Sequence, residues 1–304
     1  MKKTLFFILS VLAILLVVDV TLGAGSDCYM NRVTLPGDYR SIDYVVRECD
    51  DDIVILGSSV ALNSLVPSII EDSLAMSCFN GGANAQQLPY YLTMLDCLFS
   101  RYTPRLVILG LTPDECSTEG VGERYNILAP YYHRGYSVID SCMEQDDPVK
   151  RILLSSSMIR YNTIWWRILL YHFVTADNPG EKGYVAKDVP PALPTLLNEQ
   201  VDTITGERMV QLERFIDMCR RHNTKLIVYF PPQYRRFSTT SNSSNVAVAK
   251  ICERVGVKCV DDSQDTAFLA HPEWFYDDKH LNLNGAPVYT SRFIKHIDDV
   301  VNAQ

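Results

Sequence analysis

The hydrophobic pattern of the chain changes several times, and one short apolar run is notable for the polar residues at its end. The branched apolar residues 53–56 end at Gly57, which is followed by Ser58 and Ser59. An uncharged run of this kind predicts a strand buried on both faces, and the glycine predicts a tight turn at its carboxyl end. A helical pattern opens at Pro67, so the two serines lie where a strand gives way to helices.

The alternation of strand and helix continues along much of the chain. Apolar residues at helical spacing between the strands predict helices, the last one from about residue 284 to residue 301. This alternation is typical of a parallel sheet with right-handed crossovers. A polar loop is expected at residues 235–245. The further predicted strands are residues 74–79, 105–111, 225–230 and 257–260.

The alternation stops between about residues 116 and 204, a segment rich in aromatic residues. Its length is too great for a plain connection, so we interpret it as a helical and irregular insertion beside the edge that carries the serines. Trp165 and Trp166 are expected to pack in a core. The tyrosines of residues 130–136 are candidates for stacking on a sugar ring.

The amino terminus predicts export from the cytoplasm. Lys2 and Lys3 precede an apolar run at residues 5–18, which is either a cleaved secretory signal or a retained membrane anchor. We expect residues 1–23 to form this signal or anchor and residues 24–50 to form an irregular lead-in. Residues 51–304 are then one folded domain on the periplasmic or extracellular side of a bacterial cell membrane, or a secreted one.

Composition excludes some classes of partner. The net charge is -8, with 28 Lys and Arg against 36 Asp and Glu, so nucleic-acid binding is not expected. The nine cysteines show no paired spacing of the kind that holds a metal, so no metal site and no cofactor are expected. Cys252 and Cys259 flank a short link between a helix and a strand, and are the first pair to examine for a disulfide.

A second polar constellation lies near the carboxyl terminus. Asp277 precedes His280 by three residues, ahead of the final helix. In this arrangement the carboxylate can hold one imidazole nitrogen while the other acts as a base. A serine hydroxyl needs such a base to become a nucleophile, so Ser59, His280 and Asp277 together predict a nucleophilic triad.

These motifs resemble the SGNH/GDSL hydrolase superfamily, above all its membrane-anchored bacterial members that modify envelope polymers with acyl groups. The resemblance rests on Gly-x-Ser at residues 57–59, on residues 79–82, and on Asp-x-x-His-Leu-Asn at residues 277–282. It implies a flavodoxin-like three-layer α/β/α fold with a mainly parallel five-stranded sheet. It also implies that Ser59, rather than Ser58, is the nucleophile and that Asp277, rather than Asp278, holds the histidine. Asp278 is expected to be a solvated surface charge.

The same resemblance suggests which groups stabilise an oxyanion. The backbone N–H of Ser59 is one candidate, and the second sequence block of the superfamily maps onto Asn80, Gly82 and Ala85. The third block departs from the family pattern, since residues 110–113 lack its asparagine. Thr112 or Asn84 would have to supply the missing donor.

Two functions from different classes are consistent with these motifs. The first is a serine ester hydrolase or O-acyltransferase acting on acylated envelope or extracellular glycans. The alternative is a catalytically silent glycan-binding or scaffold subunit of a surface-polymer machine. In both cases the expected partners are a carbohydrate or other ester, the membrane through the amino-terminal segment, and further proteins of envelope assembly.

Overall fold

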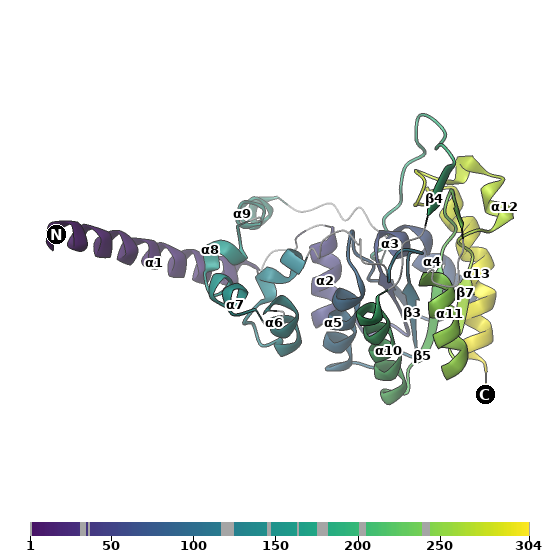
Figure 1. Ribbon diagram of the computed structural model, residues 1–304, viewed down its shortest axis with the longest axis horizontal. Helices are drawn as coiled ribbons and strands as arrows, with labels where there is room; N and C mark the ends of the chain where they lie inside the picture. Colours follow the sequence, from purple (N-terminus) through teal and green to yellow (C-terminus); the bar gives the residue numbers. More distant parts are fainter. Residues whose placement is uncertain are drawn as a thin grey trace. The chain divides into compact units, whose positions relative to one another are not determined.

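The computed structural model of the chain describes residues 2–30, 35, 37–116, 125–144, 147–162, 164–174, 182–200, 205–238 and 244–303. The chain divides into two compact units, which are coloured by sequence in Figure 1. Unit 1 comprises Met1–Tyr39 and Tyr125–Asn178, and unit 2 comprises Arg40–Arg124 and Pro179–Gln304. The segment expected as one insertion therefore contributes to both units.

A five-stranded parallel sheet forms the centre of unit 2. The spatial order of its strands is β2-β1-β3-β5-β7, and Ile53 of β1 lies opposite Cys78 of β2 on one side and Leu106 of the central strand β3 on the other. The direction of winding reverses beside β1, and ligands of open α/β sheets bind at such a reversal. The predicted fold class is confirmed. The strands are β1 (Ile53–Gly57), β2 (Cys78–Asn80), β3 (Leu106–Gly110), β5 (Lys225–Phe230) and β7 (Lys258–Asp261).

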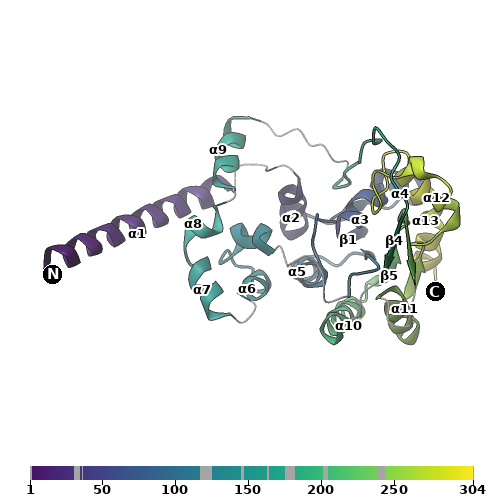
Figure 2. The same ribbon diagram turned by 45° about the horizontal axis from the view of Figure 1, so that its top comes forward.

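Helices cover both faces of this sheet, as Figure 2 shows. On one face, the fully buried rings of Tyr229, Tyr289 and Phe293 join the sheet to the last helix. Burial of such aromatic side chains contributes much of the stability of a core. The helices α3 (Ser59–Ser64), α4 (Pro67–Leu74) and α13 (Gly285–Val301) pack together, as do α5 (Leu88–Phe99), α10 (Gly206–Arg221) and α11 (Ser244–Val255).

Unit 2 also contains a two-stranded parallel sheet, in which β4 (Leu197–Gln200) pairs with β6 (Arg235–Ser238). The prediction of a polar loop at residues 235–245 is therefore wrong for residues 235–238, which form β6. Residues 239–243 lie outside the described part of the chain. Phe237 is the one apolar residue of β6, so the strand has no apolar alternation to reveal it. Two short helices, α12 (Thr266–Leu269) and η2 (Pro272–Trp274), precede the loop that carries Asp277.

The expectation of an irregular lead-in at residues 24–50 is also wrong. The first helix, α1 (Lys2–Met30), continues past residue 23, and α2 (Asp38–Arg47) comes next in the chain. In α2 the side chains of Ile42, Val45 and Val46 are buried on one face, which is the spacing of an amphipathic helix. The high proportion of polar residues in this segment masks the apolar face when composition alone is considered.

Unit 1 is helical. An 18-residue window of α1 has a mean hydropathy of 2.8 and is not buried at all, so α1 is long and apolar enough to cross a membrane. The predicted packing of Trp165 and Trp166 is wrong, because these side chains are 53% and 52% exposed. Tyr131 and Tyr132 are fully buried and not available to a ligand. The other helices are η1 (Tyr125–Tyr131), α6 (Ser137–Glu144), α7 (Pro148–Leu154), α8 (Ser157–Arg160) and α9 (Trp165–Phe173).

Candidate active site

The turn after β1 places Ser59 at the carboxyl edge of the sheet. Gly57 has a φ of 147°, and a Cβ on it would overlap the carbonyl oxygen of Gly110 at the end of β3. Only glycine fits this turn, since L side chains rarely adopt that backbone conformation. Ser58 is the N-cap residue of α3, and Ser59 is its first residue. The N–H groups of a first helical turn have no acceptor within the helix, so that of Ser59 points outward from the turn.

A compact loop between η2 and α13 carries Asp277 and His280. Asp277 accepts the backbone N–H groups of Lys279 and His280, each at 2.8 Å. The buried Asn282 holds both sides of the loop, donating to the carbonyl of Phe275 and accepting the N–H of Gly285. These hydrogen bonds fix the conformation of the loop and thereby the position of the His280 imidazole.

The structure brings Ser59, His280 and Asp277 into one hydrogen-bonded chain. The hydroxyl oxygen of Ser59 lies 2.8 Å from Nε2 of His280, across a sequence separation of 221 residues. Nδ1 of the same ring lies 2.9 Å from each carboxylate oxygen of Asp277. This is the mutual geometry that a nucleophile, a base and an orienting acid require.

The ionisation of Asp277 determines which nitrogen of His280 carries the proton. Burial raises the pKa of this carboxyl, but the hydrogen bond and charge of His280 and two backbone N–H groups outweigh it and lower the pKa to about 2. An ionised carboxylate only accepts hydrogen bonds, so Nδ1 must be protonated. Nε2 of a neutral ring is then the acceptor, and the Ser59 hydroxyl donates to it.

Ser58 and Asp278 occupy different surroundings from their neighbours. Ser58 is buried beside the phenol of Tyr91 rather than at His280. Asp278 is three-quarters buried and forms an ion pair with Arg235 of β6, whose side chain is 8% exposed. The expectation that Asp278 is a solvated surface charge is therefore wrong. The ion pair ties the loop of His280 to the two-stranded sheet, and its partner 43 positions earlier gave no signal in the sequence.

The four predicted oxyanion or substrate groups lie in different environments. The N–H of Gly82 donates to the side-chain oxygen of Asn80 at 3.0 Å, so it is already engaged. Thr112 directs its hydroxyl at Glu115, 3.4 Å away. Asn84 is exposed, and Ala85 is half-buried with a φ of 55°. The N–H of Ser59 remains the donor candidate in the triad itself.

Glu115 is a buried acid behind this edge to which the sequence alone assigns no role. It is 3% exposed and accepts the backbone N–H of Leu88 at 3.2 Å. Burial, with a smaller contribution from the charge of Asp114, raises the pKa of its carboxyl from 4.5 to about 8. The carboxyl is therefore mainly protonated at neutral pH. The signal available in the sequence was an acidic residue four positions after a predicted buried strand. The burial of Glu115, however, depends on α5.

An extended segment at residues 184–187 borders the site. The amide of Asn63 in α3 donates to the carbonyl of Val185 at 2.6 Å, and the carbonyl of Lys187 accepts the backbone N–H of Leu283 at 2.8 Å. The ammonium of Lys187 lies 5.3 Å from the ring centre of Tyr276, which is 40% exposed. An aromatic ring and a cation thus stand beside the loop of His280. In the part of the chain that the structure describes, no group of three or more potential metal ligands occurs.

No family model matches the sequence, and no curated protein is significantly similar to it. Similar solved structures include a lipase/acylhydrolase from Enterococcus faecalis, with 10% identity and a TM-score of 0.39 over 81% of this chain and 94% of that one. A proposed lipolytic protein of the G-D-S-L family from Desulfitobacterium hafniense has 7% identity and a TM-score of 0.39 over 80% and 97%. A two-domain esterase active on acetylated mannans has 11% identity and a TM-score of 0.41 over 86% of this chain and 52% of that one.

Evidence about the reaction comes from the geometry of Ser59, His280 and Asp277.

Proposed function

We propose that the chain is a serine ester hydrolase or O-acyltransferase in which Ser59 is the nucleophile. The observation that carries this proposal is the unbroken hydrogen-bonded chain from the Ser59 hydroxyl through His280 to Asp277. His280 takes the proton of Ser59 as the oxygen bonds to the acyl carbon, and returns it to the alcohol that leaves. Water, or a second hydroxyl in a transferase, then attacks the acyl-serine with the same base.

The orienting role of Asp277 follows from its charge. Its carboxylate fixes the tautomer in which Nε2 is free to accept the proton, and it stabilises the imidazolium that forms. The backbone N–H of Ser59 is the group we assign to the developing oxyanion, because its place in the first turn of α3 leaves it without a helical acceptor.

An O-acylated glycan outside the cytoplasm is the substrate class that we favour. The half-exposed ring of Tyr276 beside the loop of His280 offers a face for stacking on a sugar, and Lys187 supplies a donor next to it. The apolar helix α1, which begins with Lys2 and Lys3, supports a single-pass anchor with the chain that follows it on the outer side of a bacterial cell membrane.

A fluorophosphonate probe tests this function in the full-length protein in detergent. The probe should label Ser59, as located by mass spectrometry, and Ser59→Ala should remove the label. Ser58→Ala is the matched control and should keep it, because Ser58 does not contact His280. A label on Ser58, or none with the fold intact, would contradict the assignment, and the latter would favour the silent scaffold. Turnover of an acetyl ester with and without a carbohydrate acceptor separates hydrolysis from transfer.

A further inference from the structure

Unit 1 exposes a dense group of large apolar side chains on α7, α8 and α9, which we call the collar. In α9 the buried Ile168 lies on the inner face, while five neighbours at helical spacing point outward. So many exposed large apolar side chains on three short helices are unusual for a soluble monomer. Its most exposed members are Val149, Ile152, Trp165, Trp166, Leu169 and Phe173.

The collar is joined to the carboxyl-terminal part of α1. Asp19 accepts hydrogen bonds from the hydroxyl of Ser156 at 2.8 Å and from the backbone N–H groups of Ser157 and Met158 at 3.1 and 2.7 Å. One turn later, Gly23 lies so close to Ser157 that a Cβ there would overlap its hydroxyl. The acid that interrupts the apolar run is thereby satisfied by the start of α8. The collar accordingly lies at the level where the apolar part of α1 ends.

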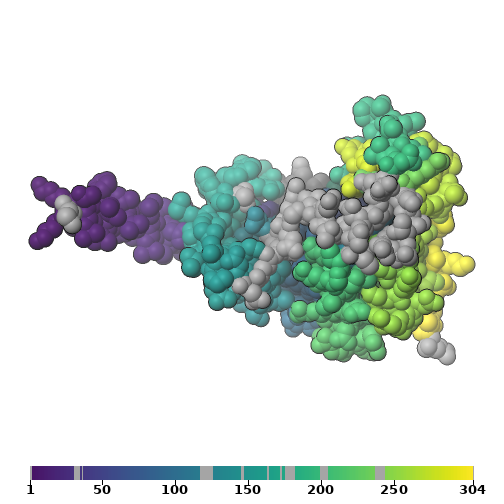
Figure 3. All heavy atoms as spheres, in the orientation of Figure 1, coloured from purple at the N-terminus to yellow at the C-terminus, as the bar shows by residue number. Residues whose placement is uncertain are grey.

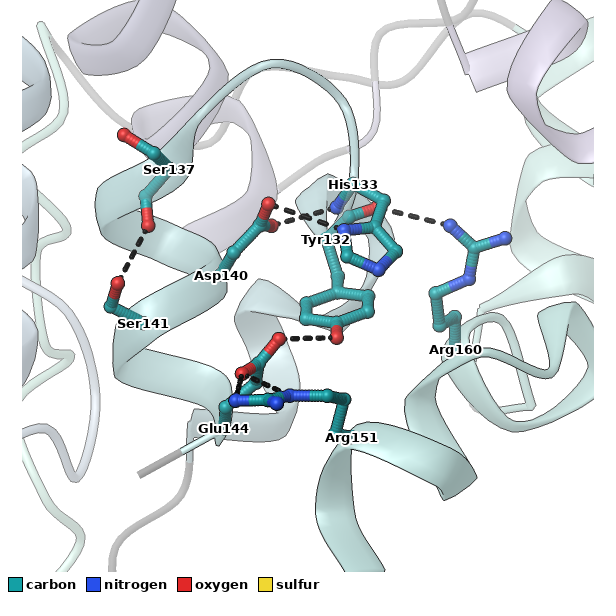
Figure 4. Close-up of polar contacts among 8 residues, drawn as sticks. All are labelled: Tyr132, His133, Ser137, Asp140, Ser141, Glu144, Arg151 and Arg160. Carbon is teal, nitrogen blue, oxygen red and sulfur yellow. Dashed lines mark hydrogen bonds and ion pairs between the residues drawn. The ribbon is translucent and has the colours of Figure 1, made fainter. Parts of the chain in front are cut away.

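Polar ties within unit 1 hold the helices of the collar in place, as Figure 4 shows. The buried hydroxyl of Tyr132 donates to Glu144 of α6 at 2.7 Å, and the same carboxylate pairs with Arg151 of α7 at 2.6 Å. Arg160 of α8 donates to the carbonyl of Tyr132 at 3.0 Å. The exposed apolar side chains therefore stand on helices with a fixed arrangement rather than on a loose segment.

The charges of the collar match a membrane surface. Lys150, Arg151, Arg160 and Arg167 lie on its three helices, which contain no Asp or Glu, although acids outnumber bases in the whole chain by 36 to 28. Exposed tryptophans with basic residues are the composition of helices that lie in the interface of a bilayer. The apolar helix α1 contacts α8 and α9, and its purple atoms adjoin the teal atoms of this part of the chain in Figure 3.

We propose that the collar is an interfacial membrane-binding surface, seated in the headgroup and acyl boundary of the leaflet from which α1 emerges. The proposal rests on the membrane-anchoring part of the proposed function and goes beyond it. The membrane anchor then consists of one spanning helix and three interfacial helices, which are joined through Asp19. Cleavage after residue 23 would remove the partner of α8, so α1 is retained as a structural element.

Tryptophan fluorescence of the full-length protein in liposomes tests the collar. A Trp274→Phe background leaves Trp165 and Trp166 as reporters, and the probes are phospholipids brominated near the glycerol or at the chain end. Shallow bromines should quench about twofold more than deep ones, and aqueous iodide should quench weakly, because the rings would lie about 5–10 Å into the boundary region. A Trp165→Phe, Trp166→Phe variant reports Trp274 of unit 2 as a reference.

Two polar variants sharpen the result. Leu169→Ser with Phe173→Ser should reduce the quenching by bromolipids and increase that by iodide, whereas Val210→Ser with Val288→Ser in unit 2 should change neither. Full quenching by iodide without a bromolipid effect would overturn the proposal. So would protection from iodide that rises with the ratio of protein to lipid, which would indicate a second copy on the collar. Labelling of Ser59 in the same liposomes shows separately whether the proposed enzymatic function holds.

Discussion

Replacing Glu115 with glutamine should remove a pH-dependent cost of folding. Burial raises the pKa of this carboxyl from 4.5 to about 8, so the folded state binds a proton that the unfolded state has released. The stabilisation from this group is fully present at pH values below the pKa of the carboxyl in the unfolded state. It is lost as the pH rises through the pKa of the carboxyl in the folded state. At about 1.4 kcal/mol for each pKa unit, the wild type should lose up to about 2.5 kcal/mol between about pH 5 and about pH 7.

The amide of Glu115→Gln keeps the acceptor for the Leu88 N–H but cannot ionise. The stability of the variant relative to wild type should therefore increase with pH by up to about 2.5 kcal/mol over the same interval. The assay is guanidinium unfolding of the full chain in mild detergent, followed by the fluorescence of Trp274. A Trp165→Phe, Trp166→Phe background makes this signal report unit 2 alone.

Glu253→Gln on the exposed face of α11 is the matched control, because it removes a charge without removing a buried one. It should shift the stability by less than about 0.5 kcal/mol at every pH. A stability difference between Glu115→Gln and wild type that stays constant with pH would refute the reasoning, since the carboxyl would then ionise alike in both states. A stability of Glu115→Gln below that of the wild type at neutral pH would also refute the reasoning.

Further predictions concern the loop of His280 and one helix end. Asp277→Asn should lower ester turnover by about 10⁴-fold with the melting temperature kept within a few degrees, measured on the same preparations; a loss within tenfold would remove Asp277 from its role. Asp278→Asn should instead lower stability by about 1–3 kcal/mol, because Arg235 loses its carboxylate, and an unchanged melting curve would contradict this. Ala75→Gly should raise stability by about 1 kcal/mol in denaturant titrations, because the exposed C-cap of α4 has a φ of 51°; a loss would mean that flexibility of the unfolded chain dominates.

The parallel sheet and the triad could be predicted because their signals are local in sequence. The uncharged run ending at Gly57 marks a buried strand and its turn, and the spacing of Asp277 and His280 marks a base with its acid. The sequence could place each group at the sheet edge, but the contact between Ser59 and His280 depends on how the whole of unit 2 folds.

The misjudged residues depended on tertiary contacts. Asp278 looks like a surface charge until β6 brings Arg235 to it, and β6 itself lacks an apolar alternation. Trp165 and Trp166 look like core residues in any soluble helix. The proposed membrane surface accounts for their exposure, because lipid rather than water would then surround that part of the chain.

The separation of 221 residues between Ser59 and His280 also bears on when the site exists during the life of the chain. A ribosome adding about 5–20 residues per second needs roughly 10–40 s to pass from the serine to the histidine. Throughout that time the serine has no base and cannot attack an ester. Under the proposed function, reactivity is thus a late product of biosynthesis, and a chain stalled or clipped before His280 is inert.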